Sequence, residues 1–451
     1  MTTAATPIAS DELEVLFGPF AADAGRPCAL AVSGGSDSTA LMVLFADWLA
    51  LSGRKAADHV VLTVDHGLRA GSTEEARGVG IEVERLGFRH AVLTWAGEKP
   101  ATGLQDAARR ARYALIAGVM RETHIVSLFT GHTRDDQAET LLMRLARGSG
   151  VDGLSAMAAR ARLLGPAAGD ASNREILRPL LDVPKSRLRA TLAARGIGWV
   201  EDPSNERAEF ERVRLRQARP ALDALGLDEE MIARSARRLQ RARAALDGVT
   251  DAFCAPDAGN VTADALGCIT IDRNALRAAG EEIALRVLVR AIRAAGGADE
   301  PVPYARLEAI VAACMSGQEA PAGQTLARAL ITPGPEEVVV EREPGRDALP
   351  ILHLAAGETA TWDGRFRIHV PADIGCSVDA RALTEPGLTA LRRAGAGTQV
   401  SRTRIRAASL VPALWTGETL LAVPALDCWA TGDRRLSTVF LGLPGSDRGR
   451  R

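Results

Sequence analysis

A glycine-containing loop near the N-terminus is the feature that most constrains how this chain folds. Its residues are Ser33-Gly34-Gly35-Ser36-Asp37-Ser38, between the apolar run Cys28-Ala29-Leu30-Ala31-Val32 and a helical pattern from Thr39 to Leu51. A strand, a tight glycine turn and a helix in this order direct backbone N–H groups and a helix N-terminus toward one point. An anion, most often a phosphate, binds at such a point. The sequence therefore predicts a phosphate-binding turn at the end of a buried strand.

The side chains of this loop extend the prediction to a cation. The three serine hydroxyls add hydrogen-bond donors, and the two glycines let the backbone approach phosphate oxygens closely. Asp37 is repulsive beside phosphates unless a cation lies between them, so the loop predicts Mg²⁺ together with a nucleotide. A serine-rich turn that binds nothing is the alternative. The strand before the turn and the helix after it favour the phosphate site.

The loop differs from the two commonest nucleotide loops. The Walker A pattern G-x-x-x-x-G-K-[ST] needs a lysine after the glycines, and the dinucleotide pattern G-x-G-x-x-G needs a third glycine. Residues 33–38 have neither. They resemble the PP-loop of the ATP pyrophosphatases, which cleave ATP between the α and β phosphates. That resemblance implies that the loop holds the leaving pyrophosphate while AMP passes to the substrate.

Length and composition indicate the class of protein. A chain of 451 residues is too long for one core and predicts two or three domains. No apolar stretch approaches the roughly 20 residues of a membrane helix, and the N-terminus does not look like a secretory signal. The six cysteines form no C-x-x-C pair, which disfavours a zinc or iron–sulfur site and a disulfide scaffold. We expect a cytoplasmic protein with reduced thiols and no membrane partner.

Strand and helix patterns alternate in the first half of the chain. Four apolar runs are interpreted as strands: Cys28 to Val32, His59 to Val64, His90 to Trp95 and Ile125 to Phe129. Helical patterns, such as those over 72–86 and 104–121, separate them. This alternation predicts an α/β fold with a doubly wound parallel sheet, in which ligands bind where the strands end. Ser33, Asp65 and Gly131 follow three of these strands, so we expect their loops to meet in one crevice.

The later part of the chain changes character twice. From about residue 179 the pattern is helical and rich in arginine, as in Met231 to Leu246, and beyond residue 323 short strands and turns dominate. We therefore predict a catalytic domain over residues 1–217, a helical domain over 218–322 and a small β-rich domain over 323–451.

Two further motifs follow predicted strands. Asp65 and His66 stand where they could hold ribose, adenine or a metal, or where Asp65 could simply cap a turn. After the fourth strand, His132, Asp136 and Glu139 have the spacing of one helical face, and carboxylates near phosphates again require a cation such as Mg²⁺ or an amine. The alternative for Asp136 is a capping box with Thr133, which leaves His132 and Glu139 unexplained.

Taken together, the motifs resemble the tRNA(Ile)-lysidine synthases, a branch of the PP-loop ATP pyrophosphatase family. The matching pieces occur in the family's order over roughly the first half of the chain. They are residues 33–38, 65–69, 108–113, 131–140, 147–150, 178–181 and 201–205, together with Arg212, Arg214 and Arg216. Two positions depart from the family pattern, because Thr133 replaces a usual histidine and Val213 replaces a usual asparagine.

The resemblance implies a reaction and its partners. ATP with Mg²⁺ activates the wobble cytidine of the tRNA(Ile) with a CAU anticodon, and free L-lysine then displaces AMP. Asp37 and Asp136 are then the expected metal ligands, and Glu139 and His132 the candidates for the lysine amine. Residues 33–38, Asp65 and His66 are expected to contact the nucleotide. A homodimer is one state that the sequence leaves open.

Five arginines are the candidates for contact with tRNA or phosphate: Arg109, Arg112, Arg212, Arg214 and Arg216. Arginine contacts to the phosphate backbone supply most of the sequence-independent affinity for RNA. The alternative is an ordinary solvated helix surface.

Two other functions compete with this one. Another PP-loop enzyme, a tRNA thiolase, is the first, although the type that carries a cluster needs the paired cysteines that this chain lacks. A non-catalytic RNA-binding protein with a degenerate loop is the second. Acidic residues that face phosphates argue against it, since RNA binding alone gains nothing from them.

Overall fold

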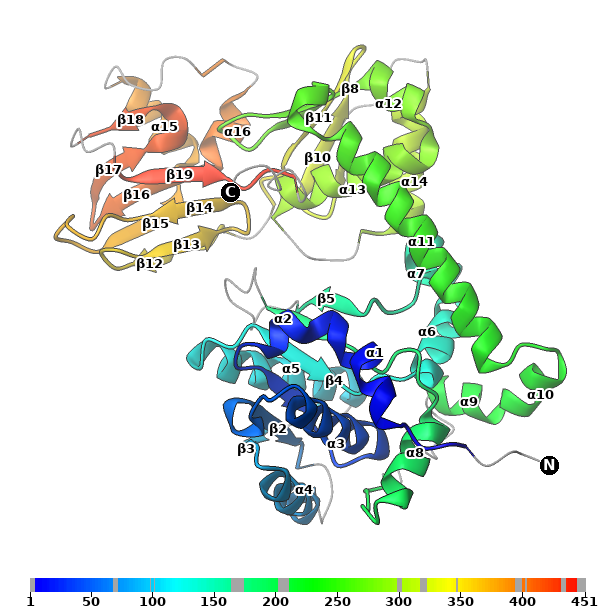
Figure 1. Cartoon of the computed structure of the whole chain (residues 1–451). Helices are drawn as coiled ribbons and strands as arrows, with labels where there is room; N and C mark the ends of the chain where they lie inside the picture. The colour runs from blue at the N-terminus through cyan, green and yellow to red at the C-terminus, as the bar shows by residue number, and fades with distance from the viewer. Residues whose placement is uncertain are drawn as a thin grey trace. The chain divides into compact units, whose positions relative to one another are not determined.

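The chain forms two compact units, Met1–Ala244 and Ala245–Arg451, which are described separately (Figure 1). The computed structural model describes residues 5–67, 72–97, 99–100, 102–163, 174–201, 211–297, 302–316, 323–345, 348–393, 400–401, 404–430 and 435–443. None of the helices formed by these residues is long and apolar enough to cross a membrane.

The first unit is built on a six-stranded sheet with the order β3-β2-β1-β4-β6-β5. Its parallel strands are β1 (Ala29–Ala31), β2 (Val60–Asp65), β3 (Arg89–Thr94), β4 (Ser127–Thr130) and β6 (Glu175–Leu177). The edge strand β5 (Arg160–Arg162) is antiparallel to β6. The four strands predicted from the sequence are confirmed, whereas β5 and β6 were not predicted, because each has only three residues and no long apolar run.

Helices cover both faces of this sheet. The helices that begin in the first unit are α1 (Leu13–Phe17), α2 (Ala21–Ala24), α3 (Ser36–Leu51), α4 (Ser72–Leu86), α5 (Leu104–Glu122), α6 (Arg134–Ala146), α7 (Val151–Leu154), α8 (Lys185–Ala194), α9 (Glu211–Gln217), α10 (Arg219–Ala224) and the long α11 (Glu229–Phe253). Leu30 and Phe129 pack on the side of α3 and α8, while their strand neighbours Ala29 and Leu128 pack against α5. Successive strand residues point to opposite faces, so this pattern confirms the doubly wound sheet.

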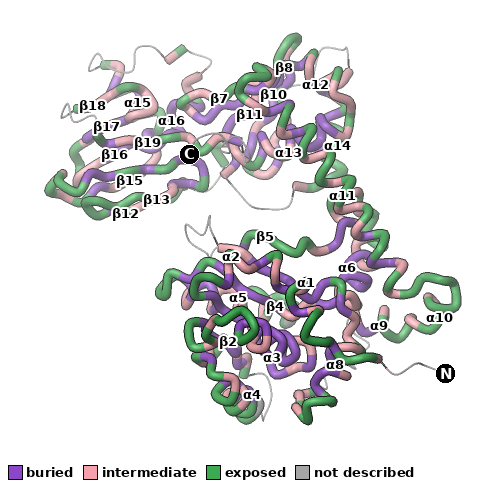
Figure 2. The backbone as a smooth tube through the Cα atoms, in the orientation of Figure 1, coloured by how far each residue is buried: buried purple, intermediate pink, exposed green. Residues whose placement is uncertain are grey.

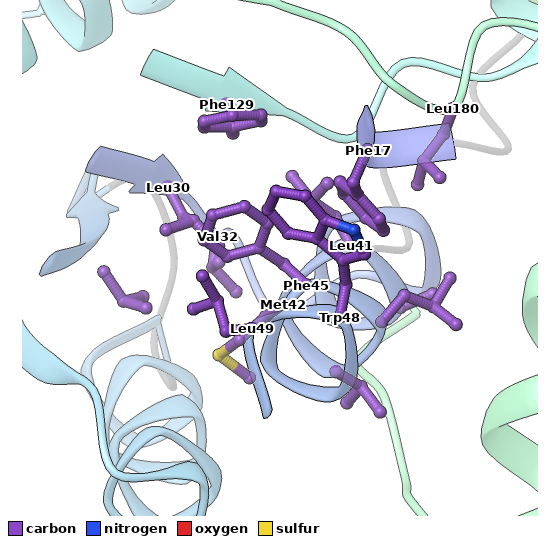
Figure 3. Close-up of a cluster of buried hydrophobic side chains, with 14 of the residues drawn as sticks. Phe17, Leu30, Val32, Leu41, Met42, Phe45, Trp48, Leu49, Phe129 and Leu180 are labelled. Atoms are coloured by element: carbon purple, nitrogen blue, oxygen red, sulfur yellow. The ribbon is translucent and has the colours of Figure 1, made fainter. Parts of the chain in front are cut away.

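An aromatic cluster holds α3 against the sheet (Figure 3). The ring of Phe45 lies 4.8 Å from that of Phe129 on β4, 5.5 Å from Phe17 and 5.9 Å from Trp48. Because α3 begins at the phosphate-binding loop, this packing fixes where the loop stands relative to β1 and β4. In Figure 2, most of α3 and β4 is coloured as buried.

The second unit contains two hydrophobic cores. The first surrounds a sheet of β7 (Val261–Ala263), β8 (Ile269–Asp272), β11 (Glu337–Arg342), β10 (Ala329–Pro333) and β9 (Gln324–Leu326), with α12 (Arg273–Ala279), α13 (Glu281–Gly296) and α14 (Tyr304–Met315). The second surrounds one sheet of β12 (Leu352–Leu354), β15 (Val378–Ala382), β16 (Pro412–Thr416), β17 (Thr419–Val423) and β18 (Cys428–Trp429), and another of β13 (Thr359–Trp362), β14 (Phe366–His369) and β19 (Ser437–Phe440). The helices α15 (Thr384–Arg393) and α16 (Ile405–Ser409) pack on this core.

The units differ in extent from the three predicted domains. The division at 244/245 falls within α11, well beyond the predicted boundary at 217/218. The predicted boundary at 322/323 falls inside a sheet, because β8 pairs with β11 from the other side of it. A pairing between residues so far apart in sequence leaves no local signal, so a segment rich in helices concealed two strands.

Phe45→Ala is expected to destabilise the first unit by about 3–5 kcal/mol, because it removes a fully buried ring from the aromatic cluster. Hydrogen exchange of α3 peptides in increasing urea measures the effect. Leu51→Ala, at the exposed end of the same helix, is the matched control and should change stability by less than about 0.5 kcal/mol. Equal loss in the two variants would contradict the role given to the cluster.

Candidate active site

The phosphate-binding loop lies between β1 and α3. Gly35 is the N-cap of α3 and no side chain caps this helix end, so the N–H groups of its first turn are left for a ligand. The Ser38 hydroxyl donates to the Gly35 carbonyl at 3.1 Å and accepts from the Ser33 N–H at 3.1 Å. The Ser36 hydroxyl donates to Asp37 Oδ1 at 2.9 Å. The serines thus shape the loop as well as supplying donors to it.

Two glycines allow the close contacts around this loop. Gly34 has a φ of 85°, a conformation that favours glycine, and its carbonyl accepts a hydrogen bond from the Val200 N–H at 2.8 Å. Gly131, directly after β4, passes against the first turn of α3. A Cβ atom there would lie 2.8 Å from the backbone oxygen of Asp37, which is closer than atoms can approach. The two strand ends therefore meet at the loop only because residue 131 has no side chain.

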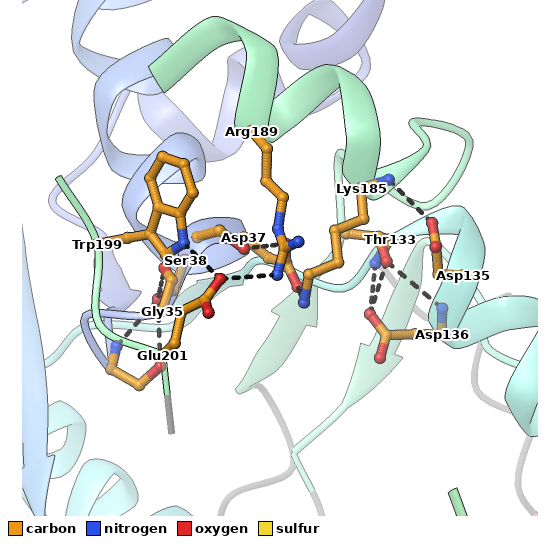
Figure 4. Close-up of polar contacts among 12 residues, drawn as sticks. Gly35, Asp37, Ser38, Thr133, Asp135, Asp136, Lys185, Arg189, Trp199 and Glu201 are labelled. Carbon is orange, nitrogen blue, oxygen red and sulfur yellow. Dashed lines mark hydrogen bonds and ion pairs between the residues drawn. The ribbon is translucent and has the colours of Figure 1, made fainter. Parts of the chain in front are cut away.

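Asp37 projects from the first turn of α3 and pairs with a lysine from another element (Figure 4). Lys185 Nζ lies 3.0 Å from Asp37 Oδ2. Burial raises the pKa of Asp37, Lys185 opposes that rise, and the charge of Asp136 adds to it. Asp37 thus stands in a partly desolvated site where negative charges accumulate and a cation is required.

The start of α6 provides the second acidic group. Thr133 caps the helix: its hydroxyl accepts from the Asp136 N–H, and Asp136 Oδ2 accepts from the Thr133 N–H at 2.8 Å. The predicted capping box is confirmed. Thr133, which replaces the usual histidine of the family pattern, therefore serves as the N-cap of α6. His132 precedes the helix, so the prediction that His132, Asp136 and Glu139 share one helical face was wrong for His132. The chain is still extended at Thr133, because a cap residue stands outside the helix.

Two groups near α6 have shifted pKa values. Burial, with nearby arginines, lowers the pKa of His132 to about 4, against the opposing charge of Asp136. His132 is therefore neutral near pH 7, and its Nδ1 lies 2.9 Å from the Thr130 hydroxyl. Burial raises the pKa of Glu139, whose side chain is only 8% exposed. Arg216 opposes that rise, with Nε 2.6 Å from Oε1 and Nη2 3.3 Å from Oε2 of Glu139.

Two adjoining cavities collect most of the predicted residues. A cavity of about 590 Å³ lies at the strand ends, and a smaller one of about 240 Å³ lies beside α6 and α9. The predicted residues that line the larger one are Ser33, Gly35, Ser36, Asp37, Ser38, Asp65, His66, Arg109, Arg112, His132, Asp136, Arg212 and Arg216. Glu139 lines only the smaller cavity, whereas Asp37, Asp136, Lys185, Arg189 and Arg216 line both.

Several predicted residues fall elsewhere or outside the description. Gly34 shapes the loop without lining either cavity, and the exposed Arg214 lines neither. Val213, between the two cavity arginines of α9, is buried. The predicted motif positions 68–69 and 202–205 lie outside the described residues.

Comparison with known proteins identifies the family. Residues 7–221 match the family model of a PP-loop domain. A tRNA(Ile)-lysidine synthase of Methylobacterium sp. (strain 4-46) is 46% identical over 315 residues, which are 68% of this chain and 86% of that protein. The chain belongs to the tRNA(Ile)-lysidine synthase family. A second member of the family, from Brucella canis, is 35% identical over 442 residues, which cover 96% of this chain and 94% of that protein.

Among solved structures, the U34-tRNA thiolase of Methanococcus maripaludis is similar with a TM-score of 0.40 and 15% identity. The match covers 53% of this chain and 89% of that one.

The predicted metal ligands suit Mg²⁺. Within the described residues, no group of three or more His, Cys, Asp or Glu side chains is placed to hold a metal ion. Mg²⁺ needs no such cage, because it commonly binds through one or two carboxylates, substrate phosphates and water. Asp37 and Asp136 supply hard oxygen ligands in the same cavity, and the Lys185 ammonium already occupies a cation position beside Asp37. The donor set fits the ion.

Lys185, Arg189 and Trp199 line the larger cavity and were not predicted as site residues. Lys185 stands at the first position of α8, and Arg189 one turn later donates to Glu201 at 3.3 Å. No spacing rule links residue 185 to residue 37. The one available signal was the family motif at residues 178–181, which lies just before Lys185.

The shifted His132 predicts a dependence of stability on pH. Between about pH 4 and pH 6.5 the unfolded chain binds more protons at this residue than the folded one, so stability falls as the pH drops through this window. His132→Asn, which replaces the imidazole by an amide that forms hydrogen bonds but does not titrate, should reduce the fall in the midpoint of thermal unfolding between about pH 7 and about pH 5. His59, His66 and His90 have lowered pKa values too, so part of the fall should remain. An identical fall in both proteins would contradict a buried neutral His132.

Proposed function

We propose that this chain joins free L-lysine to C2 of the wobble cytidine of the tRNA(Ile) with a CAU anticodon, in two steps that consume ATP. Membership of the tRNA(Ile)-lysidine synthase family supports this proposal. The structural observation that carries it is the pair of adjoining cavities: one contains the phosphate-binding loop, the other an acidic group and an apolar wall. The modified tRNA would read AUA instead of AUG and carry isoleucine identity instead of methionine.

The first step activates the cytidine. The C2 carbonyl oxygen attacks the α-phosphorus of ATP, the bond from this phosphorus to the bridging oxygen breaks, and pyrophosphate leaves. The loop N–H groups and hydroxyls would hold the pyrophosphate as its charge grows. We assign Mg²⁺ to Asp37 and Asp136, where it would neutralise phosphate charge when bound. His66 and Asp65, at the end of β2, line the same cavity and are placed for the nucleoside.

The second step uses lysine as the nucleophile. We place its side chain in the smaller cavity, where Leu142, Leu215 and Leu222 suit an alkyl chain and Glu139 suits an ammonium group. Only the neutral amine attacks, so a base must take its proton. Glu139 is the better candidate, because its raised pKa favours proton uptake while the pKa of His132 is about 4. The amine nitrogen then bonds to C2, and AMP leaves.

The tRNA would meet the site along α5 and α9. Arg109, Arg112, Arg212 and Arg216 line the larger cavity, and Arg214 lies exposed on α9. Recognition of one base taken out of a single-stranded loop is the common route to RNA specificity, and arginines hold the flanking phosphates. These proposed substrates would place the reaction in the cytoplasm.

The competing functions have less support. Among the described residues no cysteine lines either cavity, so a thiolase would lack a sulfur-bearing residue at the loop. A protein that only binds RNA would gain nothing from acidic groups as buried as Glu139. The decisive experiment supplies ATP, labelled lysine and an isoleucine tRNA transcript with a CAU anticodon. Label should enter this transcript and no transcript with another wobble base; absence of label would refute the proposal.

Asp37→Asn should abolish pyrophosphate release that depends on tRNA while leaving the fold intact, because the amide cannot hold the cation. Pyrophosphate release measures the first step directly. Asp47→Asn, on the same helix in an ion pair with Arg195, is the matched control and should retain activity. Normal turnover by Asp37→Asn would remove this residue from the mechanism.

Glu139→Gln should slow lysine transfer by about a hundredfold and leave adenylation nearly intact, because the amide neither binds the ammonium as well nor takes its proton. Adenylated tRNA should then accumulate, as seen on acid gels with labelled ATP. Glu211→Gln breaks an ion pair of α9 with Arg147 and serves as control. Equal losses in both steps would contradict the assignment.

A further inference from the structure

The ion pair between Lys185 and Asp37 has a consequence for catalysis. The loop lacks the lysine that the Walker A phosphate loop carries after its glycines. Lys185 brings an ammonium group to the same place from a distant part of the chain, 148 residues away in sequence from Asp37. Its side chain is about one-third exposed and lines both cavities, so it remains open to a ligand.

The backbone of Lys185 is held firmly. Its N–H donates to Asp135 Oδ2 at 2.9 Å, and the Arg134 N–H donates to the Val183 carbonyl at 3.0 Å. These two bonds tie the start of α8 to the first turn of α6. They hold the lysine at the junction of the cavities, while its flexible side chain can turn from Asp37 to a neighbouring phosphate.

We propose that Lys185 is a catalytic residue of the first step. In the free enzyme it neutralises Asp37; once Mg²⁺ and ATP are bound, its ammonium donates to an oxygen of the leaving pyrophosphate and stabilises the charge that grows there. No proton is transferred. This inference rests on the proposed function and adds the residue that replaces the missing loop lysine.

Lys185→Met should lower tRNA-dependent pyrophosphate release about a hundredfold at saturating ATP and Mg²⁺. Lys185→Arg should recover part of the rate, and Lys55→Met, at an exposed loop lysine, should match the wild type. A Lys185→Met rate within about threefold of wild type would overturn the proposal. A lower Mg²⁺ requirement without loss of rate would also overturn it, since the lysine would then only compete with Mg²⁺ for Asp37. If Lys185→Met does not fold, a wild-type rate in Lys185→Gln would overturn it equally. Failure of the proposed function would appear separately, as wild-type enzyme without tRNA-dependent release.

A different ion pair points to the order in which substrates bind. Glu139, the group assigned to the lysine ammonium, is held by Arg216 through two hydrogen bonds, and Arg212 Nε lies 4.0 Å away. Arg216 is a cation where the incoming ammonium must bind. Its own side chain is 42% exposed and belongs to the helix assigned to tRNA contact.

We infer that Arg216 keeps the lysine site closed until tRNA binds. A tRNA phosphate would draw Arg216 away from Glu139 and leave the carboxylate for lysine. Lysine should therefore bind well only after tRNA, which prevents the amine from occupying the site before an acceptor is present. Arg216 could instead orient Glu139 for lysine, because a carboxylate can accept hydrogen bonds from the guanidinium and from the lysine ammonium at the same time. In that case, removing Arg216 would weaken the binding of lysine.

Calorimetric titration of lysine in the absence of tRNA decides between these two roles. Arg216→Gln should bind lysine about tenfold more tightly than wild type, and Arg212→Gln, at the longer distance, should differ less. Unchanged or weaker binding by Arg216→Gln would overturn the inference. Wild-type enzyme should bind lysine more tightly when tRNA and a non-hydrolysable ATP analogue are present, and equal affinity would overturn it even if the variant does not fold. Lysine incorporation by wild-type enzyme tests the proposed function independently.

Discussion

Negative charge gathered at the ends of parallel strands is the constraint on which the site depends. Asp37, Asp136 and Glu139 stand close to the PP-loop, and burial and the charge of Asp136 raise the pKa of Asp37 and of Glu139. Each is compensated without a ligand: Lys185 pairs with Asp37, the helix cap holds Asp136, and Arg216 holds Glu139. In the free protein, cationic side chains of the chain itself thus pair with Asp37 and Glu139, the carboxylates to which we assign the metal and the lysine ammonium.

This arrangement follows from the fold. A parallel sheet brings the carboxyl ends of β1, β2 and β4 to one edge, and the loop after each strand supplies part of the larger cavity. The aromatic cluster under α3 fixes the loop from below. Residues 199–201 close the other side, where the Val200 N–H bonds to the loop backbone at Gly34. The next described element after that segment is α9. It brings Arg212 and Arg216 to the larger cavity at the strand ends and to Glu139 on α6.

The sequence predicted those features of the fold that depend on residues close together in the chain. The strand, turn and helix around residues 33–38, the alternation of strands and helices, and the capping box of Thr133 and Asp136 all depend on neighbours in sequence, and all are confirmed. Lys185 was missed because its contact with Asp37 spans 148 residues. The same limit explains the short strands β5 and β6 and the pairing of β8 with β11. Spacing singled out Glu139 as a candidate, whereas Arg216 was predicted to contact tRNA or phosphate, since spacing does not show which charges face each other.

Gly131, which passes close to Asp37, affects the shape of this site without taking part in its chemistry. The acidic and basic residues of the site carry charge as well as bulk, so replacing one of them changes the electrostatics and the shape of the cavity together. Gly131 contributes no functional group, yet a single methyl at this position would collide with the backbone oxygen of Asp37 and push the start of α6 away from the loop. The distance between the acidic helix and the phosphate loop is thus set by a missing side chain. A substitution at Gly131 would therefore change the shape of the cavity without replacing any charged or hydrogen-bonding side chain that lines it.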